Sequence, residues 1–81
     1  MPRKYTPDPA LARRLRMAMA CRNMTSADIM RRTKLGNGQI SNYLNGYQEP
    51  GATRLAQLAR ALDVSADFLL GLTDKLEVRR K

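Results

Sequence analysis

The stretch from residue 24 to residue 50 constrains the fold most, because it predicts two short helices joined by a tight turn. Thr25 suits the N-cap of a helix over about 26–33, and Asp28 stands three residues later, where it can complete a capping box. The run LGNG at 35–38 then ends this helix. Glycine and asparagine tolerate the left-handed backbone of a sharp turn, so we expect this run to supply it.

The helix expected over about 37–45 has an unusually polar face. Apolar residues share one side of it, and the pair Asn-Gly at 45–46 is a good C-terminal signal. The other positions carry Asn37, Gly38, Gln39, Ser41 and Asn42. Asparagine and glutamine can pair with adenine, serine can pair with several base edges, and a glycine lets the backbone approach DNA closely. Two such helices place side chains in a DNA major groove. A solvent-exposed face without a ligand is the alternative.

The chain has the size of one small domain, and its pattern predicts an all-α fold, a compact five-helix bundle. Helices are expected at about 9–22, 26–33, 37–45 and 52–62, with a short fifth helix capped by Ser65. We expect the fifth helix to bury Phe68, Leu69 and Leu72.

The two ends of the chain are expected to lie outside this bundle. We expect residues 1–8 to form a flexible basic arm, residues 9–72 to form the folded domain, and residues 73–81 to form a basic tail. Leu76 and Val78 alternate like an edge strand, but a frayed tail is the favoured interpretation.

Positive charge is concentrated in the first half of the chain. The net charge is +8; residues 1–40 hold nine Lys or Arg against two acidic residues, and residues 41–81 hold six against five. Such a surface suits a phosphate backbone or an anionic membrane, and it is also compatible with a merely soluble basic protein. An amphipathic membrane helix over 9–22 is disfavoured, because the other helices need its narrow apolar stripe as a core partner.

Composition argues against catalysis and metal binding. The chain has no histidine and a single cysteine, Cys21, so it lacks the commonest general base and can form neither a zinc site nor an intrachain disulfide. No apolar run is long enough to span a bilayer. We therefore expect no enzyme, cofactor, metal or small-molecule ligand. A lone cysteine also suits a reducing compartment, so the expected location is cytoplasmic.

Three strings carry a family resemblance: LARRLR at 11–16, TSADIMRRTKLGNGQISNYLNG at 25–46, and LAQLARALDVSADFLLG at 55–71. Together they resemble the phage repressor and Cro-type (XRE) helix-turn-helix family, and the resemblance covers about residues 11–72. It implies a helix-turn-helix bundle of the lambda-repressor type that binds DNA.

The resemblance also implies which residues touch DNA. Bases would be contacted by Asn37, Gly38, Gln39, Ser41 and Asn42, and phosphates by Thr25, Ser26 and Asn45. Homodimers would form through residues 49–52 and 66–68. Lys34 occupies a turn position that the family commonly fills with glycine. From the basic arm, we expect Arg3 and Lys4 to enter the adjacent minor groove.

These observations predict a sequence-specific double-stranded DNA-binding transcriptional regulator, a repressor that binds a palindromic operator as a homodimer. One short helix contacts few base pairs, so two half-sites are needed to raise discrimination. The alternative is a protein-interaction module, such as an antitoxin or adaptor that neutralises or recruits a partner protein. A third interpretation is that the chain is one domain of a longer repressor.

Overall fold

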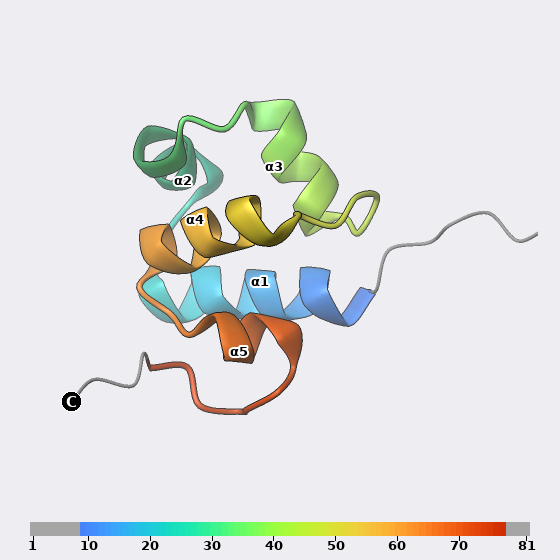
Figure 1. Cartoon of the computed structure of the whole chain (residues 1–81). Helices are drawn as coiled ribbons and strands as arrows, with labels where there is room; N and C mark the ends of the chain where they lie inside the picture. The colour runs from blue at the N-terminus through green and yellow to red at the C-terminus, as the bar shows by residue number, and fades with distance from the viewer. Residues whose placement is uncertain (1–8, 78–81) are drawn as a thin grey trace, which may run out of the picture.

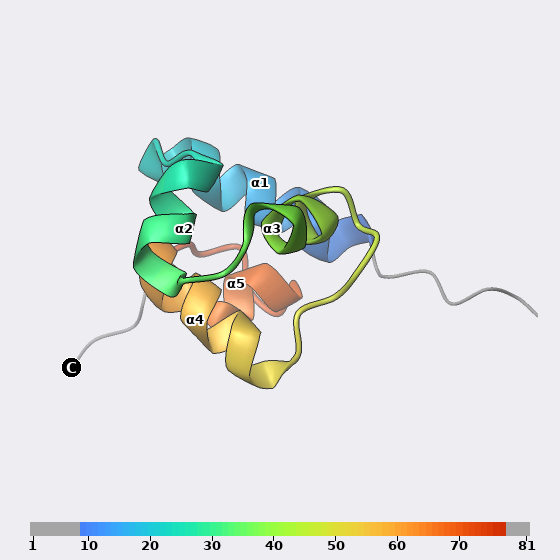
Figure 2. The same cartoon turned by 90° about the horizontal axis from the view of Figure 1, so that it is seen from above.

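The computed structural model describes residues 9–77 and folds them into a bundle of five α-helices, as the sequence predicts. The helices are α1 (Pro9–Arg22), α2 (Ser26–Thr33), α3 (Asn37–Leu44), α4 (Ala52–Leu62) and α5 (Ala66–Leu70). Figure 1 shows α2 and α3 together at one end and α5 at the other, with α1 and α4 between them. Seen from above, α3 lies beside α1, and α2 lies beside α4 (Figure 2). Within this described part, no helix has the length and apolarity that crossing a membrane requires.

One apolar core joins all five helices. Its fully buried side chains are Leu15, Ile29, Ile40, Leu58, Leu62, Val64 and Leu69. They come from every helix because each helix presents an apolar face at helical spacing, as Leu58 and Leu62 do four residues apart in α4. Burying one such side chain contributes about 1.5–3 kcal/mol, so these contacts are the main force that assembles the short helices.

The end of α5 differs from the prediction. Phe68 and Leu69 are buried as expected, but Leu72 is 73% exposed. Gly71 has a φ of 81° and ends the helix, so Leu72 no longer follows the periodicity that would have buried it. Leu76 packs against the core instead.

Residues 73–77 are attached to the bundle. The Ser65 N–H donates to the Leu76 carbonyl at 2.9 Å, and Arg14 Nη1 donates to the Thr73 carbonyl at 3.1 Å. The prediction of a frayed tail is therefore wrong for this segment, and the segment contains no strand. An apolar anchor and two backbone hydrogen-bond acceptors hold it in place.

The N-terminus of α2 is capped as predicted. The Thr25 hydroxyl accepts a hydrogen bond from the Asp28 N–H at 3.3 Å, and the Thr25 N–H donates to the Asp28 carboxylate at 2.9 Å. This capping box satisfies donors that a bare helix start would leave unpaired. Ser65 caps α5 as expected, by accepting from the Asp67 N–H at 3.1 Å.

The turn between α2 and α3 is built differently from the prediction. Its left-handed residue is Lys34, with φ 64°, whereas Gly36 has φ −73° and an extended backbone. The helical hydrogen bonding of α2 continues as far as Lys34, whose N–H donates to the Met30 carbonyl at 3.0 Å, so the chain reverses there. Leu35 then enters the core, and Gly36 becomes the N-cap of α3.

Candidate nucleic-acid interface

The outer face of α3 is polar and accessible. Ile40 and Tyr43 are buried on the opposite side and fix the helix to the core. Of the predicted base-contacting residues, Asn37, Gly38 and Ser41 are exposed, and Gln39 and Asn42 are half-buried. A Cβ placed on Gly38 would meet no atom within 4 Å, so the space in front of the α3 backbone is open there.

Gln39 lies at the edge of this face. Helical periodicity puts it beside Tyr43, and its Nε2 donates to the Tyr43 hydroxyl at 3.0 Å. Both residues border a pocket of about 380 Å³ that α3 forms with the loop following it. The Gln39 side chain is thus directed toward Tyr43 and the loop.

Asn42 is linked to the loop that follows α3. Its Nδ2 donates to Gln48 Oε1 at 3.4 Å, and its carbonyl accepts from the N–H groups of Tyr47 and Gln48 at 2.9 and 3.3 Å. Gly46 has a φ of 75°, which lets the chain turn back along the helix. The loop therefore orients the Asn42 amide, and Tyr47 within it remains 71% exposed.

The start of α2, a predicted phosphate-contacting position, already holds a carboxylate. Thr25 donates both its O–H and its N–H to Asp28 Oδ2, at 3.1 and 2.9 Å. These bonds, the backbone one first, and the charges of Arg31 and Arg32 lower the pKa of Asp28 below its ordinary value of 3.8. Arg31 also forms an ion pair with this carboxylate. The Thr25 hydroxyl is thus engaged, which leaves Ser26 as the side chain better able to meet a phosphate.

Asn45, the third residue predicted to contact phosphate, is tied to α1. It is the C-cap of α3. Arg16 donates from Nε to the Leu44 carbonyl at 2.8 Å and from Nη2 to Asn45 Oδ1 at 2.9 Å. Asn45 Nδ2 in turn donates to Ser41 Oγ at 3.2 Å. A residue predicted to contact phosphate and one predicted to contact a base are therefore joined to a cation of α1.

Arg16 and Gln48 are the residues of this surface that the sequence does not reveal. Arg16 is one of several cations outside the apolar stripe of α1, and its bond to Asn45 spans 29 positions of the chain, so no local pattern indicates it. Gln48 lies six positions from Asn42, in a loop without regular periodicity.

Arg3 and Lys4, predicted for the minor groove, lie outside residues 9–77. Within those residues, no cluster of His, Cys, Asp or Glu could hold a metal ion.

Comparison with known proteins identifies the family. Residues 14–75 match the family model of the Cro/C1-type HTH DNA-binding domain. The chain belongs to this family. It is also 33% identical over 72 residues to the HTH-type transcriptional regulator ImmR of Bacillus subtilis (strain 168). That match covers 89% of this chain and 54% of ImmR, so the chain spans about half the length of this curated relative. No solved structure matches.

Membership of the Cro/C1-type family confirms the resemblance of the three sequence strings and the helix-turn-helix fold. It also confirms that the domain is of a DNA-binding class and not an enzyme. The helix-turn-helix pair of this Cro/C1-type domain is α2 and α3.

Proposed function

We propose that this chain is a sequence-specific transcriptional regulator that binds double-stranded DNA with α3 in the major groove. The observation that supports this best is the outer face of α3, where polar residues are accessible while Ile40 fixes the opposite side. Amide and hydroxyl side chains pair with base edges in the major groove, and a helix-turn-helix presents them there. The family assignment and the likeness to a regulator of transcription support the same function.

Asn42 is the principal base-contacting residue in this proposal. Its bond to Gln48 uses one N–H of the amide, which leaves Oδ1 and the second N–H for adenine N6 and N7. Asn37, Gly38, Gln39 and Ser41 complete the base contacts, and Thr25, Ser26 and Asn45 contact phosphates. The α2 N-terminus suits that role through its main-chain N–H groups.

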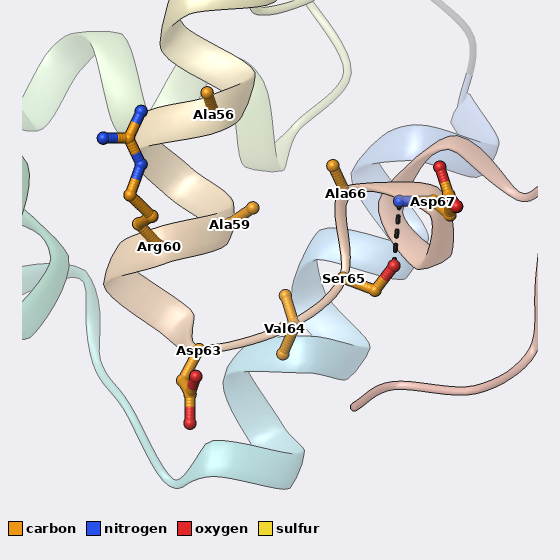
Figure 3. Close-up of a pocket in the computed structure, with 8 residues that line it drawn as sticks. All are labelled: Ala56, Ala59, Arg60, Asp63, Val64, Ser65, Ala66 and Asp67. Carbon is orange, nitrogen blue, oxygen red and sulfur yellow. Dashed lines mark hydrogen bonds between the residues drawn. The ribbon is translucent and has the colours of Figure 1, made fainter. Parts of the chain in front are cut away.

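We further propose that the regulator is a homodimer on a palindromic operator. A pocket of about 540 Å³ lies where α4 meets α5 and includes part of the dimer segment implied by the family resemblance (Figure 3). Half of its lining is small and apolar, Ala56, Ala59, Val64 and Ala66, and half is polar or charged, Arg60, Asp63, Ser65 and Asp67. Ala66 and the half-exposed Leu70 lie four residues apart and share a face of α5. This surface supports pairing of two copies. Phe68 is buried, so in this proposal the pairing uses its neighbours Ala66 and Leu70.

Repression would follow from occlusion, since a dimer on an operator inside a promoter keeps polymerase from that DNA. A reporter with the selected site placed over its promoter tests this. We expect expression to fall when the chain is present and to recover with Asn42→Ala. Increased expression would show activation instead.

The DNA-binding proposal is tested by selecting sites from random duplex DNA and titrating the best site against a scrambled duplex at two salt concentrations. We expect a two-fold symmetric site, with half-sites about one helical turn apart, bound at least ~10³-fold more tightly than the scrambled duplex. Sedimentation of the complex gives the number of chains per site. Weak, steeply salt-dependent binding without enrichment would contradict base recognition and favour a protein-interaction module.

A further inference from the structure

We infer that Arg16 is a positioning residue that sets the direction in which Ser41 hydrogen-bonds a DNA base. The inference rests on the proposed function, because it requires Ser41 to face the major groove. Three side chains carry it, Arg16 from α1 and Ser41 and Asn45 from α3 and its C-cap, and we refer to them as the Arg16 network.

The donor and acceptor of each hydrogen bond in the Arg16 network follow from the chemistry of a guanidinium. A guanidinium has donors and no acceptor, so the Asn45 atom 2.9 Å from Arg16 must be the amide oxygen. The bond from Arg16 Nε to the Leu44 carbonyl at 2.8 Å holds the guanidinium in this position. The planar amide then directs its nitrogen to the other side, where it donates to Ser41 Oγ at 3.2 Å. The two ends of the Asn45 amide are therefore not interchangeable.

Ser41 keeps its proton and one lone pair for the DNA. Its oxygen accepts from Asn45, and among residues 9–77 no group accepts its own proton. A serine without such a partner can donate or accept at a base edge. The exposed Ser41 hydroxyl already accepts one hydrogen bond, which uses one of its two lone pairs and strengthens it as a donor, so the Arg16 network biases it toward donation. On the contacted strand, donation suits the acceptors of guanine, adenine and thymine. Cytosine offers only an amino donor in the major groove, so it is the disfavoured base.

A simpler role for Arg16 makes a different prediction. If Arg16 only tied α1 to the end of α3, or only added a positive charge near phosphates, its loss would weaken binding to every sequence by the same factor. Only a network that orients Ser41 changes the preference at one base pair. The base preference, not the affinity, is therefore the decisive measurement.

The test uses the site selected by the wild-type chain. Ser41→Ala first identifies the base pair whose preference Ser41 sets, and four duplexes then carry each base in turn at that position. In the wild type we expect cytosine on the contacted strand to bind about fivefold more weakly than the best base, the size of one net hydrogen bond. Arg16→Met should reduce this difference to less than about twofold.

Two further variants serve as matched controls. Arg13 is exposed on the same helix, so Arg13→Met removes the same charge outside the Arg16 network and should keep the discrimination against cytosine. Arg16→Lys should also keep it, because an ammonium, like a guanidinium, can only donate.

Asn45→Asp should reverse the preference. The new carboxylate still accepts from Arg16, but it now also accepts from the Ser41 hydroxyl, whose lone pairs then face the DNA. Cytosine should become favoured over thymine at this position. The added negative charge should weaken binding to all four duplexes together, which does not alter their order.

Three results would overturn the inference. One is that Arg16→Met and Arg13→Met lower the affinity for the four duplexes by the same factor. Another is that Ser41→Ala changes no base preference. The third needs no DNA: the side-chain amide NMR signals of Asn45 should shift with Arg16→Met and not with Arg13→Met, and equal spectra would show that the network does not form. If the wild type selects no sequence at all, the proposed function itself fails, and this is seen before any variant is made.

Discussion

The guanidinium of Arg14 lies over the ring of Phe68, 4.9 Å from its centroid, and donates to the Phe68 carbonyl at 3.0 Å. The same group donates to the Thr73 carbonyl and pairs with Asp74, so one side chain of α1 holds both α5 and the segment after it. Its side chain is only 22% exposed, which makes these bonds stronger than those of a surface arginine.

Arg14→Met should destabilise the fold by about 2 kcal/mol, because two carbonyls lose their donor and the cation–π contact is lost. In a domain of this size that lowers the melting temperature by about 10 °C, which thermal unfolding followed by circular dichroism would show. Asp74→Asn is the control: the Asp74 side chain is 98% exposed, so its loss should change stability little. Equal effects of the two changes would mean that the ion pair dominates.

Lys34→Gly should stabilise the protein by about 1 kcal/mol. Lys34 has a φ of 64°, a conformation that costs a side-chain-bearing residue more than it costs glycine. Lys34→Ala removes the same charge and keeps the unfavourable φ, so it should give no gain in urea unfolding. If both changes stabilise equally, the effect comes from relieving charge repulsion and not from the backbone.

Asp28→Asn should remove a contribution to stability that depends on pH. The pKa of Asp28 is lowered from 3.8 in the folded state, chiefly by its hydrogen bonds from Thr25. A lowered pKa means that the contribution is present above pH 3.8 and is lost as the pH falls through the folded-state pKa. The difference in melting temperature between wild type and variant should therefore be largest near neutral pH and should disappear below pH 3.8. Glu77→Gln, at an exposed position after α5, removes one carboxylate without touching the cap of α2 and serves as the control.

The sequence predicts those features of the fold that depend on local chemistry. The caps at Thr25 and Ser65 follow from residues two or three positions apart, and the five helices follow from apolar periodicity. The errors at Lys34 and Leu72 concern how the chain leaves a helix: which residue takes the left-handed conformation after α2, and which leucine returns to the core after α5. Both depend on which side chain the core accepts next, Leu35 after α2 and Leu76 after α5, and local patterns do not contain that information.

In the candidate interface, too, the sequence predicts the local features and not the tertiary contacts. Helical periodicity alone places Ser41 and Asn42 outside the apolar stripe that Ile40 and Tyr43 form on α3. The partners that orient them, Asn45 with Arg16 for one and Gln48 for the other, become neighbours only after α1 and the loop pack against α3. Long side chains such as arginine can meet many partners, so tertiary packing selects the one observed.

Asn42→Ala should cost roughly 1–3 kcal/mol on the selected site and leave binding to random DNA nearly unchanged, because a bidentate base contact is lost while phosphate contacts remain. Gln48→Ala should cost less, since it only frees the Asn42 amide to rotate. Fluorescence anisotropy with specific and scrambled duplexes measures both. A loss of the same size on both duplexes would show that Asn42 does not contact a base.

The half-sites should be rich in A·T pairs. α3 contains no arginine, the residue that most often contacts guanine, and it carries asparagine and glutamine, which pair with adenine. Sequencing the selected duplexes tests this directly. A G-rich consensus would contradict it and would direct attention to the arginines outside α3.

The two ends of α3 are held unequally. At its C-terminal end, Arg16 bonds both Leu44 and Asn45, whereas the N-cap Gly36 makes no side-chain capping bond. We therefore expect the first turn of the helix, at Asn37, to move more than its last turn, at Leu44. In a dimer, each half-site would then meet a stiff end that tolerates little variation in DNA shape and a compliant end that adapts to it. The half-site should therefore tolerate more sequence variation opposite the Asn37 end of α3 than opposite the end that Arg16 holds.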